Sequence, residues 1–161
     1  MKLLLDMKIR VATIEDIPQM SKLWFELMNY HRDHHQVFVA KENAEDFIND
    51  EFEKRMAIPE CCFFLAIIEG QLAGFISCSI RKVQNVMIYN KRGYVAETVV
   101  GQEFRGNGIG EKLFNRAEDW FKEEGADHIE LQVSLKNDGA FNFWKNQGFS
   151  STTRHMVKFL E

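Results

Sequence analysis

The sequence predicts an α/β (α+β) fold in which a mixed, mostly antiparallel sheet is flanked by helices. Apolar residues recur at helical spacing in some segments and form short strand-like runs in others, and the two kinds of segment are interspersed along the chain. Two strand-like runs flank Glu69 and Gly70, and so short a connection joins antiparallel strands. A purely parallel sheet would need a crossover between every two neighbouring strands, so that arrangement is excluded.

The first third of the chain predicts one strand and two helices. The strand is expected over residues 8–12. A helix is expected over 14–29, where apolar residues recur every three or four positions, and Thr13 can cap it with Asp16 three residues on. A second helix over 43–56 has one apolar side and stops before a proline.

The middle of the chain predicts a hairpin, a strand and a long helix. Residues 61–68 and 71–80 form the two arms of the hairpin. Residues 93–100 are expected to form a further strand. Residues 109–125 place their large apolar side chains on one helical face and end at a glycine, so an amphipathic helix is expected there.

The last third predicts a strand, a helix and a closing strand. Residues 128–133 alternate between polar and apolar side chains, as a half-buried strand does. A helix begins at Asn137 or Asp138 and stops at Gly148. The closing strand is expected over 152–160.

Composition indicates one cytoplasmic domain over residues 1–161. Hydrophobic residues make up 45% of the chain, and the net charge of −4 comes without a basic stripe, which excludes nucleic acid as a main partner. The leucines before Asp6 are too few for a signal peptide, and nothing approaches transmembrane length, so no membrane partner is expected. The odd number of cysteines (Cys61, Cys62 and Cys78) lacks a CxxC pair and predicts buried free thiols and no metal site.

The segment 105–110, RGNGIG, lies between a predicted strand and a predicted helix. The first turn of a helix leaves backbone N–H groups without partners and carries a partial positive charge, so it can hold a phosphate. Glycines let the phosphate approach the backbone, and Arg105 can add charge. The alternative is a tight turn with a helix cap. The spacing fits neither the nucleotide-triphosphate loop nor the dinucleotide fingerprint.

RGNGIG resembles the Arg/Gln-x-x-Gly-x-Gly/Ala signature of the GNAT superfamily, the Gcn5-related N-acetyltransferases. A later stretch, NDGAFNFWKNQGF, resembles the second motif of that family. The residues that fill its places are Asn137, Ala140, Trp144, Gly148 and Phe149. The opening and closing stretches are also similar, so the resemblance covers nearly the whole chain.

The resemblance implies a GNAT fold and an enzyme that transfers acetyl from acetyl-CoA to a primary amine by direct attack on the thioester. It implies that backbone N–H groups of Arg105, Gly106, Asn107, Gly108, Ile109 and Gly110 hold the pyrophosphate. The strand end at Val99 and Val100 would pair with the pantetheine arm, and the N–H near Val100 would polarise the thioester carbonyl. Asn137 and Trp144 would lie beside the cosubstrate, and no metal is required.

The resemblance makes Glu97 the candidate base, or else an anchor for the cationic amine; a surface glutamate that only holds a neighbour is the alternative. Many family members carry tyrosine where Trp144 stands here, and that tyrosine can protonate the departing sulfur. Indole is not a practical acid, so the thiol would leave as thiolate or take a proton from water.

The acceptor is expected to be a small-molecule amine rather than a protein amine, and a homodimer is possible. The alternative function is a catalytically silent acyl-CoA-binding regulatory module. His31, His34 and His35 share a spacing that suits a metal or a substrate contact, although solvated loop residues are the preferred interpretation.

Overall fold

The computed structural model describes residues 6–160 and shows one five-stranded sheet in the order β1-β2-β3-β4-β5. The predicted absence of a signal peptide concerns residues 1–5, which lie outside the described residues. The strands are β1 (Met7–Val11), β2 (Cys61–Ile68), β3 (Gln71–Lys82), β4 (Lys91–Val100) and β5 (His128–Glu130). The helices are α2 (Ile17–His31), α3 (Ala44–Met56), α4 (Ile109–Glu123) and α5 (Asp138–Asn146), with 3-10 turns η1 (Ile14–Asp16), η2 (Gln36–Phe38) and η3 (Gln102–Phe104).

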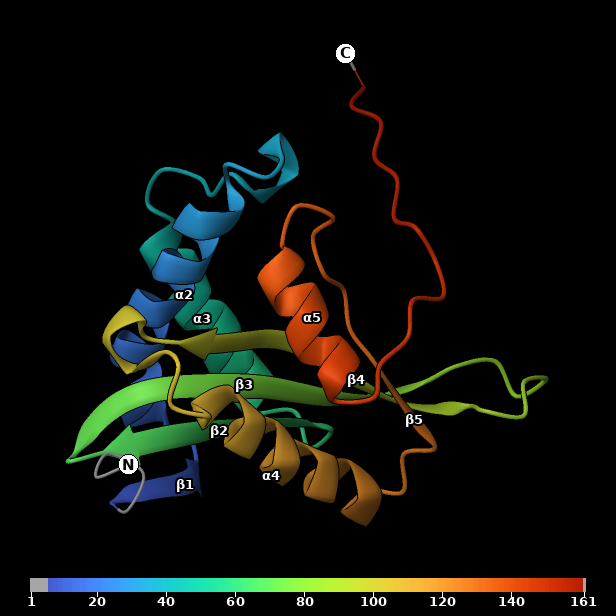
Figure 1. The fold of residues 1–161 in the computed structure, drawn as a ribbon, viewed down its shortest axis with the longest axis horizontal. Helices are drawn as coiled ribbons and strands as arrows, with labels where there is room; N and C mark the ends of the chain where they lie inside the picture. The colour runs from blue at the N-terminus through green and yellow to red at the C-terminus, as the bar shows by residue number, and fades with distance from the viewer. Residues whose placement is uncertain (1–5, 161) are drawn as a thin grey trace.

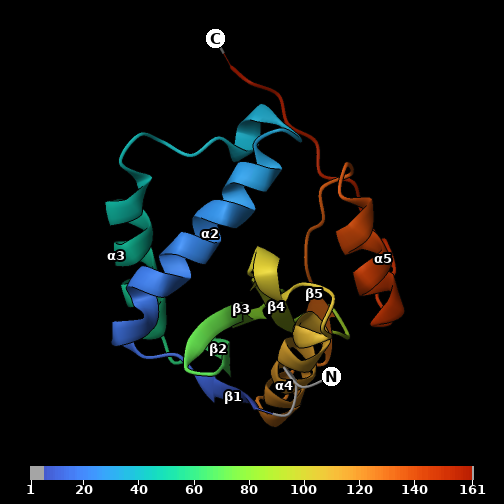
Figure 2. The ribbon, with the colours of Figure 1, turned by 60° about the vertical axis from the view of Figure 1, so that its left-hand side comes forward.

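Helices cover both faces of the sheet, α2 and α3 on one side and α4 and α5 on the other (Figures 1 and 2). The alternation of side chains along the strands supplies both cores. On β3, Phe75 packs into the core under α2 and α3, whereas Ile76 and Cys78 pack against α4. The expected mixed, mostly antiparallel sheet is confirmed, because among the strands of residues 6–160 only β4 and β5 pair in parallel.

The predicted hairpin is confirmed at residue level. Ile68 pairs with Gln71, and the two connecting residues, Glu69 and Gly70, both have positive φ angles, of 49° and 79°. Two positive φ angles are what a two-residue turn needs to follow the twist of the strands it joins. Helix α2 begins three residues later than predicted, because residues 14–16 form the turn η1.

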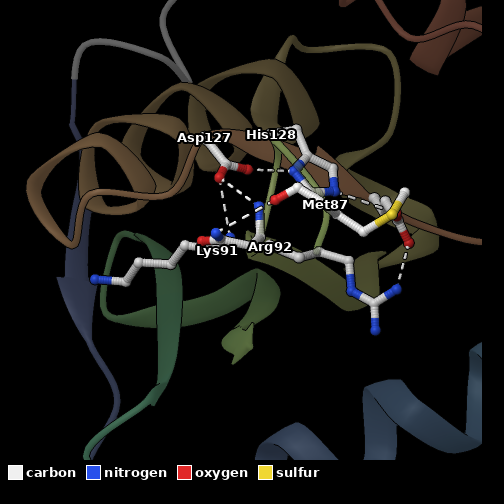
Figure 3. Close-up of polar contacts among 7 residues, drawn as sticks. Met87, Lys91, Arg92, Asp127 and His128 are labelled. Carbon is white, nitrogen blue, oxygen red and sulfur yellow. Dashed lines mark hydrogen bonds and ion pairs between the residues drawn. The ribbon is translucent and has the colours of Figure 1, made fainter. Parts of the chain in front are cut away.

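Polar contacts fasten the start of β5 to the start of β4 (Figure 3). The Asp127 carboxylate accepts hydrogen bonds from the backbone N–H groups of Asn90 and Lys91, at 2.8 and 2.9 Å. The N–H of Lys91 and contact with His128 lower the pKa of Asp127. Arg92 pairs with Glu130 at 2.8 Å. The ladder then covers only Arg92, Gly93 and Tyr94 of β4, so the two strands are joined at one end only.

Two strand predictions near the carboxyl end are wrong. Strand β5 stops at Glu130 rather than at residue 133, because β4 and β5 pair no further. Residues 152–160 form no strand, contrary to the prediction, because no strand of the described chain lies beside them to complete a ladder. In Figure 1 this carboxyl tail leaves the foot of α5 and runs away from the sheet.

In the part of the chain from 6 to 160, the structure has no helix long and apolar enough to cross a membrane.

Gly74 is the position where the sheet tolerates a side chain least. A Cβ there would lie 2.5 Å from the backbone oxygen of Val99 on β4. We expect Gly74→Ala to lower the stability by about 1–3 kcal/mol, because the strand must move to relieve the overlap. Thermal unfolding measures this as a fall of about 2–4 °C per kcal/mol.

Gly139→Ala is the matched control for Gly74→Ala. In α5 the new Cβ would lie 3.8 Å from Asn137 Oδ1, which is ordinary contact, and alanine favours helix over glycine by about 1 kcal/mol. We expect an unchanged or higher melting temperature. Equal melting temperatures for the two variants would contradict the predicted overlap.

Candidate functional site

The glycine-rich loop, residues 105–110, connects η3 to α4. Two of its glycines adopt the left-handed backbone conformation, and open space surrounds both. Gly106 and Gly108 have φ angles of +78° and +71°, in the left-handed region. A Cβ at either position would meet no atom within 4 Å. Gly110 differs, because it lies in the first turn of α4 and a Cβ there would contact the Phe143 ring at 3.5 Å. The first two glycines therefore set the turn and also leave its outer surface bare.

The backbone N–H groups of residues 106–111 donate to no group in the described part of the chain. The N–H of Lys112 is the first of α4 to find a helical acceptor, the carbonyl of Gly108, at 3.2 Å. An array of unpaired N–H groups at the positive end of a 15-residue helix can bind an anion. The structure thus brings together the amides of Gly106, Asn107, Gly108, Ile109 and Gly110, as the sequence predicts.

Arg105 lies differently from the other predicted phosphate contacts. Its backbone N–H points back into the turn and donates to the carbonyl of Gln102 at 3.4 Å. Its side-chain Nε donates to the carbonyl of Val100 at 3.0 Å. The guanidinium therefore closes the end of β4 and keeps its terminal nitrogens free to add charge beside the loop.

The second half of β4 presents an open edge toward β5. Gly101 donates its N–H to Ala73 on β3 at 2.9 Å, and neighbouring residues of a strand turn their N–H groups to opposite edges. The N–H of Val100 therefore lies on the β5 side, where the ladder has already ended. The hydroxyl of Thr98 is buried without a hydrogen-bond partner in the described residues. The Val99 side chain is buried in the core under α2 and α3.

Glu97 is held by two residues from other elements, which we call the Glu97 cluster (Arg55, Ser77 and Glu97). The two carboxylate oxygens accept from the two terminal nitrogens of Arg55, at 3.1 and 3.0 Å. The Ser77 hydroxyl also contacts the Glu97 carboxylate, and it accepts the Glu97 backbone N–H at 2.9 Å. The Arg55 and Glu97 side chains are only 17% and 15% exposed, so the ion pair lies largely out of water.

A bulge in β4 orients the carboxylate of this cluster. Ile76 pairs with Thr98 and Cys78 pairs with Val95, so Ser77 faces both Ala96 and Glu97. The extra residue puts Val95 in the core against α4 and Glu97 beside α3, on opposite faces of the sheet. Side chains alternate between the two faces of the sheet from Glu97 to Val100, but the alternation does not extend back to Val95.

The Arg55 guanidinium lies 4.8 Å from the centre of the Phe63 ring, which adds a cation–π contact. Burial acts to lower the pKa of Arg55, and the adjacent Glu97 carboxylate outweighs it, so the pKa is raised. Arg55 and Ser77 were not predicted from the sequence. They lie 42 and 20 residues from Glu97 in sequence, and the signals available were a cation in the last turn of a helix and a serine within an apolar strand.

An open cavity of about 850 Å³ adjoins the Glu97 cluster on the α3 side of the sheet. Arg55 and Ala96 line it, and it extends over the carboxyl end of β3 and the amino end of β4. Its rim carries Arg81 and Lys82 as well as Glu51 and Glu60. The Arg81 guanidinium lies 3.8 Å from the centre of the Tyr94 ring. Both signs of charge therefore border the space beside Glu97.

Asn137 and Trp144 both have structural partners. Asn137 Oδ1 accepts the N–H of Ala140 at 3.0 Å and caps α5, which leaves its amide nitrogen available. Trp144 is 8% exposed and packs edge-on against Phe114 and Phe149, with ring centres 5.2 and 5.4 Å apart. The structure therefore places Trp144 in the core beside α4 and does not bring it to the open edge of β4.

The three histidines lie at the end of α2 and form no metal centre. Tyr30, His31 and His34 pack together, and His35 Nδ1 accepts the N–H of Val37 at 3.2 Å. Burial, with a smaller effect of His34, lowers the pKa of His31. Residues 6–160 contain no group of three or more His, Cys, Asp or Glu side chains that could hold a metal ion.

The sequence model of the Acetyltransferase (GNAT) family matches residues 15–149. An uncharacterised N-acetyltransferase of Methanocaldococcus jannaschii is 30% identical over 88% of this chain and 59% of its own length. The N-alpha-acetyltransferase MAK3 of Arabidopsis thaliana is 32% identical over 60% of this chain and 48% of its own length. The chain thus spans about half the length of these two relatives.

Another relative matches over nearly its full length. The aminoalkylphosphonate N-acetyltransferase of Salmonella typhimurium is 28% identical over 95% of this chain and 91% of its own. Two solved structures share the fold. A mutant of a Bacillus halodurans protein has a TM-score of 0.85 at 22% identity, covering 96% of this chain and 99% of its own. An aminoglycoside N-acetyltransferase in complex with CoA has a TM-score of 0.78 at 19% identity, covering 96% and 94%.

We expect Arg55→Met to lower the free energy of unfolding by about 3 kcal/mol, because it leaves the Glu97 carboxylate without its charged partner in a site poor in water. The double variant Arg55→Met/Glu97→Gln should lose less than the single variant, since no unpaired charge remains. Urea unfolding at pH 7 measures both. Lys122→Met, which breaks an exposed pair with Glu118, is the control and should change stability by about 0.5 kcal/mol or less.

Proposed function

Because the chain belongs to the Acetyltransferase (GNAT) family, we propose that it transfers an acetyl group from acetyl-CoA to a primary amine by direct attack on the thioester. The observation that carries this proposal is the row of unpaired N–H groups at the start of α4, next to an open strand edge. The pyrophosphate and the thioester would then bind on adjoining parts of one continuous segment, residues 98–111. The reaction needs no metal, because the attacking amine and the thioester carry its chemistry.

Binding begins at the glycine-rich loop. The N–H groups of residues 106–110 would hold the pyrophosphate of acetyl-CoA, and the guanidinium of Arg105 would add a charged contact. The bare surface over Gly106 and Gly108 admits phosphate oxygens to the backbone. The free amide nitrogen of Asn137 would contact the cosubstrate from the α5 side.

The open edge of β4 would then orient the thioester. The pantetheine arm carries amide groups, which can pair with the edge of the strand near Val99 and Val100 as another strand would. The N–H of Val100 would donate to the thioester oxygen, where negative charge develops as the amine attacks. A donor already fixed in a sheet does this without reorganising.

Glu97 would bind the amine on the face of β4 that is covered by α3, next to the strand edge that orients the thioester. Its Oε1 accepts one hydrogen bond from Arg55 and keeps room for another partner, an ammonium group or a water molecule. In this arrangement Glu97 anchors the amine and takes its proton directly or through water. Arg55 and Ser77 act as positioning residues, because they hold the carboxylate in place.

The departing sulfur finds no acid in the described site. Trp144 is buried, and its indole N–H is not acidic enough to protonate a thiolate. A thiol with a pKa of about 8.5 leaves adequately as thiolate at neutral pH and can then take a proton from water.

We propose a small-molecule amine as the acceptor. The cavity beside Glu97 carries cations at Arg81 and Lys82 and anions at Glu51 and Glu60, which favours a compact acceptor bearing both an ammonium and an anionic group. The Salmonella relative, which matches over nearly the full chain, is an aminoalkylphosphonate acetyltransferase. A protein amino terminus is the second candidate, because MAK3 is an N-alpha-acetyltransferase.

A binding module without turnover is the remaining alternative. The Arg55–Glu97 ion pair favours this alternative, because the carboxylate of Glu97 already has a charged partner. Such a module would bind acetyl-CoA through the same loop and acetylate nothing.

The loop is tested by thermal unfolding with and without acetyl-CoA. At 100 times its dissociation constant the cosubstrate should add about 2.7 kcal/mol, a rise of about 5–10 °C for a domain of this size. ATP at the same concentration should give a much smaller rise. We expect Gly106→Ala to lose most of the acetyl-CoA shift, because the new Cβ occupies the bare surface of the loop.

Gly70→Ala is the matched control for Gly106→Ala. Gly70 also has a positive φ, of 79°, and open space around it, but it lies in the β2–β3 turn. Both variants should lose similar stability without ligand, and only Gly106→Ala should lose the ligand response. An equal acetyl-CoA shift in the melting temperatures of the two variants would show that the loop does not bind acetyl-CoA.

The role of Glu97 is tested by release of free CoA with a panel of amines. If Glu97 takes the proton, Glu97→Gln should lower kcat by about 10²–10⁴-fold, while the acetyl-CoA thermal shift persists. A loss confined to KM would make it an anchor only. Wild-type protein that binds acetyl-CoA and acetylates neither small amines nor peptides would favour the silent module.

A further inference from the structure

The connection between β3 and β4, residues 83–90, exposes four consecutive large apolar side chains, which we call the apolar tip. Val86 and Ile88 are 83% and 90% exposed, and Met87 and Tyr89 are exposed as well. Neither core of the described chain includes any of the four. Single exposed apolar residues are ordinary on a protein surface, whereas a run of four indicates a surface that contacts something else.

Backbone hydrogen bonds hold the apolar tip in place at its base. The N–H of Val83 donates to the carbonyl of Asn90 at 3.0 Å, and the N–H of Met87 donates to the carbonyl of Gln84 at 3.1 Å. The Asp127 carboxylate accepts the N–H of Asn90 at 2.8 Å. In Figure 1 the connection between β3 and β4 projects beyond the end of the sheet. The tip is therefore a convex projection with an ordered base.

Four cations, which we call the basic collar, lie at the base of the tip. Arg81 and Lys82 end β3, and Lys91 and Arg92 begin β4. In the ladder Arg81 pairs with Arg92 and Lys82 pairs with Lys91. Like charges directly opposite each other lower the stability of a sheet. Residues 81–92 include no Asp or Glu to offset them. The fold does not require such an arrangement, so it indicates an anionic partner.

Neighbouring groups offset only part of the charge of the collar. Arg92 forms an ion pair with Glu130 at 2.8 Å, and Lys91 donates from Nζ to the carbonyl of Glu124. Arg81 and Lys82 are exposed, and neither forms an ion pair with a carboxylate of residues 6–160. The whole chain has a net charge of −4, so the collar is a local excess of positive charge.

We propose that the apolar tip and the basic collar together form a docking site for an anionic lipid surface. The side chains of the tip enter the boundary between headgroups and acyl chains, and the cations of the collar contact the anionic headgroups. Lys91 follows Tyr89 by two residues, which is about 7 Å of extended chain. Apolar side chains at a membrane surface are buried about 5–10 Å deep, so the spacing suits both contacts. Tyrosine is enriched at this depth.

A lipid surface suits a convex tip better than a folded partner does. Fluid acyl chains close around projecting side chains, whereas a protein partner would need a pocket of matching shape. The expectation of no membrane partner came from the search for spanning segments and signal peptides, and a surface contact requires neither. Docking of this kind is independent of acetyl transfer, because it uses no residue of the glycine-rich loop or of the Glu97 cluster. Arg81 and Lys82 also border the cavity beside Glu97, so binding is measured without acetyl-CoA or an acceptor.

The first experiment measures sedimentation of the full chain with lipid vesicles. One set of vesicles is phosphatidylcholine alone, and the other also contains phosphatidylglycerol, which is anionic. At about 0.05 M salt we expect the anionic vesicles to bind at least about tenfold more tightly, and at about 0.5 M salt to lose most of that advantage, because salt screens the collar. No binding to anionic vesicles at low salt, or equal binding to both kinds, would overturn the proposal.

Two matched isoleucine variants separate insertion of the tip from electrostatic attraction alone. Ile88→Ser lies in the tip, and Ile14→Ser makes the same change in η1, where the native side chain is 63% exposed. We expect Ile88→Ser to weaken binding to the anionic vesicles about tenfold or more, and Ile14→Ser to leave it nearly unchanged. Both exposed positions should keep the melting temperature of the wild type. Equal vesicle binding by the two variants would contradict insertion.

A matched pair of lysine variants tests the collar. We expect Lys82→Gln to weaken binding to the anionic vesicles about fivefold, because each cation near an anionic surface adds to the attraction. Lys22→Gln removes an exposed cation from α2 and should have little effect. If both variants bind as the wild type does, the collar does not contact the lipid and the proposal is wrong.

Tryptophan fluorescence shows whether the tip enters the lipid. Tyr89→Trp places a probe in the tip, and the spectrum of the wild type, with its own three tryptophans, is subtracted. On addition of anionic vesicles we expect the probe to emit at shorter wavelength and to be quenched by lipids brominated in the acyl chains. Tyr30→Trp, at the end of α2 where the native side chain is 49% exposed, should show neither change. Unchanged emission from Tyr89→Trp would overturn the proposal.

Discussion

The attachment of β5 to β4 at one end only is the constraint on which the candidate site depends. Asp127 accepts the N–H groups of Asn90 and Lys91 and so fixes where the parallel ladder starts, and the ladder ends at Tyr94. Beyond that point β4 pairs with β3 alone, so the backbone of Val100 keeps a free edge on the β5 side. The glycine-rich loop and α4 follow directly, which aligns the unpaired amides of the loop with that edge.

The Glu97 cluster connects this edge to the opposite face of the sheet. The bulge at Ala96 and Glu97 turns the carboxylate toward α3, where Arg55 neutralises it and Phe63 covers the guanidinium. A lone carboxylate would be costly at this depth, so the ion pair allows it to remain charged there. The same strand thus offers an N–H donor at one edge and a fixed negative charge on one face, within four residues.

Much of the fold was predictable from local pattern. The Glu69–Gly70 turn, the amphipathic helix α4 and the glycine-rich loop follow from residue types at short spacing, and the structure confirms these elements. Arg55 and Ser77 could not be assigned to the Glu97 cluster, because a bulge and a helix end bring them there from distant positions. The closing strand over 152–160 was wrong for a related reason: residue types predict that a segment can pair, whereas pairing also requires the segment to lie beside a free strand edge.

The sheet separates two cores that share strands but no side chains. Phe63, Leu65 and Phe75 fill one core with α2 and α3, and Phe64 and Ile76 fill the other with α4 and α5. Substitutions in separate cores have nearly additive effects when their side chains do not touch. Natural variation can therefore reshape the cavity bordered by α3 while the packing that supports the glycine-rich loop is retained. Such a division makes the molecule evolvable: one half can diversify while the other is inherited unchanged.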